Sequence, residues 1–127
     1  MTIGEKDLLF KDLCARLPYG IKFLRESWNQ ELSVIYEWDE VLEDIDKDGY
    51  INRTKVYNVG DIKPYLFPLS SMTEEQQKEY QYITERWMYD SSYSIADSID
   101  WLNKNHFDYR GLIEKGLAID ATGLNIY

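Results

Sequence analysis

Three aspartates stand at alternate positions in the stretch DIDKDGYI, and a glycine follows the third of them. Carboxylate oxygens are the ligands that Ca²⁺ prefers, and a helix-flanked calcium loop places them at its first, third and fifth positions. Glycine occupies the sixth position of such a loop, and a backbone carbonyl is the ligand at the seventh. With Asp44 as the first position, the sequence predicts a candidate calcium site at Asp44, Asp46, Asp48 and Tyr50.

The rest of the stretch departs from the calcium-loop pattern. The twelfth position, where a bidentate acid is required, is Lys55, and both flanks alternate between apolar and polar residues as strands do. Asp48-Gly49 is typical of a tight hairpin turn, because glycine adopts a positive φ without strain. Two interpretations stay open. One is a solvated hairpin tip, which explains more of the pattern; the other is an incomplete calcium site completed by an acid such as Glu40 or Glu43.

The segment before this loop combines carboxylates with large aromatic rings. The candidate partner-binding residues are Tyr36, Trp38, Asp39, Glu40 and Glu43. An acidic surface of this kind favours docking of a basic protein, because complementary charges accelerate association. A narrower alternative is that the carboxylates imitate nucleic-acid phosphates and so inhibit a host defence protein. The structural alternative is a charged sheet edge that resists aggregation.

The sequence contains no recognisable catalytic motif. It has one cysteine, Cys14, and one histidine, His106, which excludes an intrachain disulfide and a metal site with two histidines. No nucleophile elbow, dinucleotide fingerprint or Walker A string occurs in it. Pairs of carboxylates are almost no sign of catalysis in this chain, because any acidic protein contains many such pairs. We therefore expect a protein without catalytic residues or a cofactor, Ca²⁺ being the alternative.

Length and composition indicate an ordinary globular protein. The chain has 127 residues, 44% hydrophobic and 29% charged, which favours one domain over residues 1–127. The net charge of −9 argues against binding to nucleic acid or to an anionic membrane, both of which need a basic surface, and permits a basic protein partner. The N-terminus lacks the pattern of a signal peptide, and no stretch approaches the ~20 apolar residues of a membrane span. We expect a cytoplasmic protein.

Hydrophobic periodicity and capping residues predict three helices. Leucines spaced four apart predict the first helix over residues 4–17, before a Pro-Tyr-Gly break. In TEEQ, Thr73 and Gln76 form the pattern of a capping box and predict the start of the second helix. Ser94 or Ser92 is the expected cap of the third helix, which ends near Asn105.

Alternation with a period of two predicts strands over residues 21–26, 32–41 and 50–59, the last two joined by the DIDKDG turn. Pro64 and Pro68 interrupt the segment 60–71, which is expected to be an ordered connection and not a central strand. The predicted fold class is α+β, with a small antiparallel sheet of about three strands and three helices packed on it.

Three longer strings, KDLCARLPYGIK, DIKPYLFPLSSMTEEQ and DWLNKNHFDYRGLIEKGLAIDATGLNIY, resemble a family of small acidic proteins from gut Bacteroidales and their phages and mobile elements. Residues 28–58 show no such resemblance. The resemblance implies no activity, cofactor or catalytic residue. It implies an accessory protein of phage or mobile-element origin that binds another protein. The sequence as a whole thus predicts a non-catalytic protein-interaction module of undefined oligomeric state.

Overall fold

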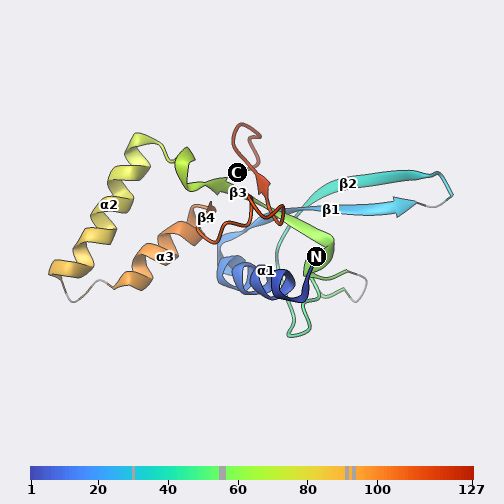
Figure 1. Cartoon of the computed structure of the whole chain (residues 1–127), viewed down its shortest axis with the longest axis horizontal. Coiled ribbons are helices and arrows are strands. Elements are labelled where there is room, and N and C mark those ends of the chain that lie inside the picture. Colours follow the sequence, from blue (N-terminus) through green and yellow to red (C-terminus); the bar gives the residue numbers. More distant parts are fainter. Residues whose placement is uncertain (30, 55–56, 91, 93) are drawn as a thin grey trace.

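The computed structural model describes residues 1–29, 31–54, 57–90, 92 and 94–127, and it shows an α+β fold (Figure 1). The helices are α1 (Ile3–Arg16), α2 (Glu74–Tyr89) and α3 (Ile95–Lys104). The strands are β1 (Lys22–Asn29), β2 (Val34–Val41), β3 (Ile62–Pro68), β4 (Phe107–Asp108) and β5 (Ile119–Asp120). Short 3₁₀ turns cover Leu17–Tyr19, Val59–Asp61 and Leu69–Ser71. The predicted fold class is confirmed.

Local capping fixes where the helices begin. The predicted capping box of α2 is present, since the Thr73 side chain accepts from the Gln76 N–H and the Gln76 side chain accepts from the Thr73 N–H. Ser94 is the N-cap of α3, and its N–H donates to Asp97 Oδ2 at 2.7 Å. α3 ends at Lys104 with Asn105 as its C-cap, close to the predicted end near Asn105. No helix among the described residues has the length and apolar character that crossing a membrane requires.

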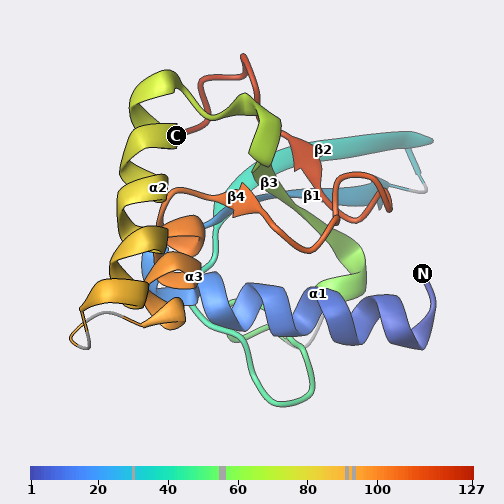
Figure 2. The same cartoon turned by 60° about the vertical axis from the view of Figure 1, so that its left-hand side comes forward.

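The sheet has five strands and is mixed, in the order β2-β1-β3-β4, with β5 also paired to β3. β1 and β2 form a long antiparallel hairpin in which all eight residues of each strand are paired. β1 pairs antiparallel with β3 over only three positions, Phe23 to Arg25. β4 and β5 are short and run parallel to β3. Figure 2 shows α1 running beneath this sheet.

The prediction of a strand over residues 50–59 is wrong. This segment forms only isolated bridges, Ile45 with Ile51 and Tyr50 with Asn58, while residues 55–56 lie outside the described part. Asn52 and Arg53 have φ of 50° and 63°, and such left-handed residues interrupt an extended strand. The partner of β2 is therefore β1, and the chain reverses between Asn29 and Val34, where residues 31–33 are described, instead of at DIDKDG.

The prediction that 60–71 contains no central strand is also wrong, because β3 lies inside the sheet. The Leu42 N–H donates to the Ile21 carbonyl at 2.8 Å, so hydrogen-bonded pairs of the hairpin fall at every second position from there. Phe23 thus directs its main-chain groups toward β2, and its pairing with Pro64 in β3 is a non-hydrogen-bonded one. At such a position β1 requires no N–H donor from β3, so the missing N–H of Pro64 costs no hydrogen bond to β1.

The hydrophobic core lies between α1 and the sheet. Leu9 and Leu13 of α1 are fully buried and pack in one cluster with Phe23 and Leu66. A second cluster of Trp101, Leu102 and Phe107 packs beneath α2, where the rings of Trp101 and Phe107 stack at 5.7 Å. The first cluster attaches the hairpin to α1 through Phe23, and the second attaches α2 and α3 to β4.

A fully buried ion pair joins α1 to β4. Asp12 and Arg16 are both 0% exposed, and Arg16 Nε donates to Asp12 Oδ2 at 2.8 Å. Arg16 Nη2 also donates to the carbonyl of Phe107 at 2.7 Å, and Arg110 Nε reaches Asp12 Oδ1 at 3.2 Å. One carboxylate therefore holds two guanidinium groups, which come from segments far apart in the sequence.

The Tyr127 side chain connects β1, β3 and the residue that precedes β4. Its hydroxyl accepts from the Lys22 N–H at 2.9 Å and donates to the Tyr65 carbonyl at 2.9 Å. Its ring stacks on that of His106 with 3.8 Å between centroids. Burial, together with the charges of Arg16 and Lys22, lowers the pKa of His106 to about 4, so this ring is neutral at pH 7.

The buried pair gives a first prediction. We expect Asp12→Asn to reduce the free energy of unfolding by about 3–5 kcal/mol, because it leaves a buried guanidinium without its counter-charge. Denaturant titration measures this difference. Asp7→Asn is the matched control, since Asp7 lies exposed on the same helix. A loss below about 1 kcal/mol for Asp12→Asn contradicts the structural role of the pair.

His106 gives a second prediction. Its pKa is lower in the folded protein than its ordinary value of 6.5, so the unfolded state binds more protons between about pH 6.5 and pH 4. We expect stability to fall as the pH falls through this range, by at most about 1.4 kcal/mol per pH unit. Denaturant titrations at pH 6.5 and pH 5 measure the slope. His106→Asn should flatten it while tolerating the φ of 64°; equal slopes contradict the assignment.

Candidate functional site

The β1–β2 hairpin extends beyond the rest of the sheet (Figure 1). Only residues 23–25 of β1 pair with β3, whereas the hairpin continues to Asn29 and Val34. Figure 1 shows the hairpin and the α2–α3 pair reaching out on opposite sides of the molecule. The predicted partner-binding residues belong to this hairpin or to the loop that follows it.

Trp38 and Glu40 lie on one face of β2 and are held by residues that the sequence analysis did not single out. The Trp38 Nε1–H donates to Glu40 Oε1 at 2.6 Å, and the Tyr57 hydroxyl donates to Glu40 Oε2 at 3.0 Å. Arg25, directly opposite Trp38 in the hairpin, places its guanidinium carbon 4.7 Å from the Trp38 ring centroid and 3.6 Å from that of Tyr57. Arg25 Nη1 is also 3.5 Å from Glu40 Oε1.

This cluster changes what Glu40 contributes. Partial burial opposes its ionisation, but the hydrogen bonds from Trp38 and Tyr57 and the charge of Arg25 outweigh burial and lower the pKa of the carboxyl below its usual value. Glu40 is therefore ionised at pH 7 and already has a positive partner in Arg25. It orients Trp38 and Arg25, and adds little free negative charge to the surface.

Asp39 lies on the opposite face of β2, where the Tyr65 hydroxyl donates to its Oδ1 at 2.6 Å. Burial of the phenol and its hydrogen bond to Asp39 raise the pKa of Tyr65 to about 12, so the hydroxyl stays a donor. Glu43 is exposed beyond the end of β2, and its N–H donates to Asn52 Oδ1. The side chain of Tyr36 lies outside the described residues. The predicted set therefore falls on two faces of the hairpin.

Three residues that contact the predicted set were not indicated by the sequence, namely Arg25, Tyr57 and Tyr65. Period-two alternation placed Arg25 in a strand, but its position opposite Trp38 follows only from the β1–β2 register. Tyr57 and Tyr65 reach the hairpin from segments that the sequence could not pair with it. A signal was present for Arg25 alone, since Arg and Trp that face each other across a hairpin form a favourable cation–π pair.

The DIDKDG stretch forms a turn built around Asp46. Asp46 Oδ1 accepts from the N–H groups of Asp48 and Tyr50 at 2.9 Å each, and the Gly49 N–H donates to the Asp46 carbonyl. Gly49 has a φ of 84°, which explains why glycine occupies this position. The hairpin-turn interpretation of Asp48-Gly49 thus holds locally, although the turn does not join two long strands.

The calcium hypothesis receives no support from this geometry. In the part of the chain that the structure describes, which includes Asp44, Asp46 and Asp48, no three Asp, Glu, His or Cys side chains gather into a group that could hold a metal ion. Lys55, the predicted twelfth position, lies outside the described residues. Calcium binding at Asp44, Asp46, Asp48 and Tyr50 stays a prediction.

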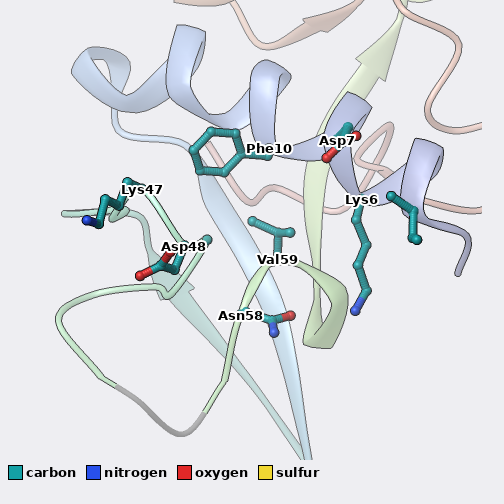
Figure 3. A pocket seen from close by; sticks show the side chains of 9 residues that line it. Lys6, Asp7, Phe10, Lys47, Asp48, Asn58 and Val59 are labelled. Atoms are coloured by element: carbon teal, nitrogen blue, oxygen red, sulfur yellow. The ribbon is translucent and has the colours of Figure 1, made fainter.

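A shallow groove of about 350 Å³ lies between this turn and the start of α1 (Figure 3). Figure 3 shows Phe10 of α1 and Val59 between its charged walls. Each wall carries one lysine and one aspartate, Lys6 with Asp7 on α1 and Lys47 with Asp48 on the turn. Because these charges balance, the groove has no preference for an anion or a cation.

Comparison with known proteins gives no relative from which a function can be transferred. No protein-family model matches the chain, and neither a curated protein nor a solved structure shows a significant similarity to it. The resemblance of the three sequence strings therefore stays an expectation. The function has to be argued from the geometry of the hairpin and its neighbours.

The turn gives a third prediction. We expect Asp46→Ala to lower the free energy of unfolding by about 1–2 kcal/mol, because two backbone N–H groups lose their acceptor. Thermal unfolding in EDTA, in millimolar Ca²⁺ and in millimolar Mg²⁺ measures the effect, with Asp48→Ala as the matched control. An equal loss in all three solutions is expected. A rise specific to Ca²⁺ in the unchanged protein, lost in Asp46→Ala, would instead establish the calcium site.

Proposed function

We propose that the protein is a non-catalytic interaction module that binds a basic protein partner through the β1–β2 hairpin. The hairpin's length carries this proposal. β1 and β2 are each eight residues long, whereas three positions suffice to attach β1 to β3. The outer part of the hairpin adds no further pairing with the described strands, and a projecting ladder of this kind is suited to contact another chain.

The charge of the hairpin supports a basic partner. Its carboxylates are Glu26, Glu31, Glu37, Asp39 and Glu40, against the two basic residues Lys22 and Arg25. Arg25 already pairs with Glu40, while Glu37, Asp39 and Glu43 are exposed. The net charge of the whole chain has the same sign, which strengthens attraction of a basic surface over distances near the Debye length.

The aromatic cluster supports a specific contact in addition to attraction by charge. Trp38 is half-buried, and its indole N–H and ring are both fixed, by Glu40 and Arg25 respectively. A large ring held in one orientation before binding loses little conformational entropy on contact. The resemblance noted in the sequence also favours an accessory protein that acts by binding. The nucleic-acid mimic stays a narrower form of the same proposal.

Reversal of exposed charges tests the proposal. We expect the double variant Glu37→Lys/Glu43→Lys to lose the partners that the unchanged protein captures from a bacterial lysate. Both side chains are exposed, and the Asp39–Tyr65 bond and the Glu40 cluster stay intact. Capture at increasing salt, read by mass spectrometry, measures the loss, because contacts between exposed charges weaken as salt screens them.

The matched control is Glu85→Lys/Glu114→Lys, which changes the net charge equally at exposed positions away from the hairpin. It should keep the same partners as the unchanged protein. Equal retention by both double variants contradicts a role for the hairpin. Equal loss in both shows that only the total charge matters, which also contradicts the proposal.

A further inference from the structure

The outer edge of β2 has main-chain groups whose direction can be deduced from a single hydrogen bond. Since the Leu42 N–H donates to the Ile21 carbonyl, the residues of β2 that bond to β1 are the even-numbered ones from Val34 to Glu40. The N–H and C=O groups of Ile35, Glu37 and Asp39 therefore point away from β1. No strand among the described residues pairs with β2 on that side.

One end of this edge is closed by a side chain. Val41 also points outward, and its carbonyl accepts from Asn52 Nδ2 at 3.0 Å. Asn52 Oδ1 in turn accepts from the N–H groups of Glu43 and Asp44 at 2.8 and 3.2 Å. The loop after β2 thus folds against the strand end, and the open edge consists of the stretch from Ile35 to Asp39.

We propose that this edge binds an extended basic segment of the partner, which adds to the sheet as a further strand beside β2. This inference rests on the proposed function and specifies how the partner binds. Exposed strand edges are a recurrent site of such addition, in which main-chain hydrogen bonds provide the affinity and alternate side chains provide the specificity.

The side chains beside the edge define the incoming strand. Glu37 and Asp39 lie on one face, so a strand with Lys or Arg at every second position places its cations directly opposite them. Trp38 lies on the other face, where the intervening residues of the partner meet its half-buried ring. The matching segment therefore alternates basic residues with β-branched or aromatic ones.

The same charges disfavour a second copy of this chain as the added strand. Pairing β2 with β2 of another copy would bring Glu37 and Asp39 close to identical carboxylates, and like charges opposite each other destabilise a ladder. Acidic side chains beside an open edge are also a known protection against edge-to-edge aggregation. The edge thus favours a basic strand over the β2 strand of a second copy.

A blocked peptide of sequence KVKYKVK is the probe, with EVEYEVE as the matched control. In antiparallel addition, the residues opposite Glu37 and Asp39 form the hydrogen-bonded pairs, so their own N–H groups bond to β2. We expect N-methylation of the lysine nitrogens to weaken binding by more than about tenfold. N-methylation of the valine and tyrosine nitrogens, which point to solvent, should change it by less than about twofold. In parallel addition the valine and tyrosine nitrogens would bond to β2 instead, so methylation of these would weaken binding and methylation of the lysine nitrogens would not.

Amide hydrogen exchange provides the second readout. On binding of KVKYKVK, exchange at Glu37 and Asp39 should slow, while exchange at Trp38, whose N–H already bonds to β1, should be unchanged. Glu37→Lys should weaken peptide binding, and Glu114→Lys, at an exposed position away from the hairpin, should not. Sensitivity of one methylated set, with new protection at Glu37 and Asp39, supports strand addition.

The other outcomes overturn it in distinguishable ways. If both methylated peptides bind equally and no amide gains protection, the peptide docks by side chains alone, and the proposed function stands without strand addition. If KVKYKVK does not bind, or binds no better than EVEYEVE, strand addition by a basic segment is excluded, while the lysate capture decides the proposed function separately. Protection of Glu37 and Asp39 in a concentration-dependent dimer without peptide would assign the edge to a second copy.

Discussion

The buried carboxylate of Asp12 is the constraint on which the arrangement of this protein depends. It binds Arg16 within α1 and Arg110 from the segment after β4, and Arg16 continues to the Phe107 carbonyl. Asp108, the next residue, accepts from the N–H groups of Arg110, Leu112 and Ile113 and so shapes the turn that follows. The Asp12–Arg16 pair attaches the C-terminal third of the chain to α1, and α1 in turn packs against the sheet from which the hairpin extends.

The fold divides into parts that local sequence determines and parts that it does not. Helix α2 could be predicted because Thr73 and Gln76 lie three residues apart and satisfy each other's backbone groups. β3 could not, because Pro64 is tolerated only where it faces Phe23 at a non-hydrogen-bonded position, and Phe23 belongs to a strand 41 residues earlier in the chain. The strand predicted over residues 50–59 is absent although the sequence alternates there, because the local conformations of Asn52 and Arg53 are not extended.

The candidate site shows the same division at the level of single residues. The sequence identified the acidic and aromatic character of β2, including Trp38 and Asp39. It could not show that Arg25 lies over Trp38 and offsets Glu40, because that depends on the register of a hairpin whose tip was placed at the wrong turn. Beside the outer edge of β2, the exposed carboxylates are Glu37 and Asp39, while Glu40 on the other face is offset by Arg25.

The hydroxyl of Tyr127 has a consequence for the order in which the protein is made. It bonds to the Lys22 N–H across 105 positions of the chain and to the Tyr65 carbonyl across 62. A ribosome that has released β1 and β3 has not yet released the hydroxyl that joins them at this point, so both backbone groups lack this partner until Tyr127 emerges. The pairs of the β1–β2 hairpin are close in sequence, so we expect the hairpin to form before Tyr127 joins β1 to β3.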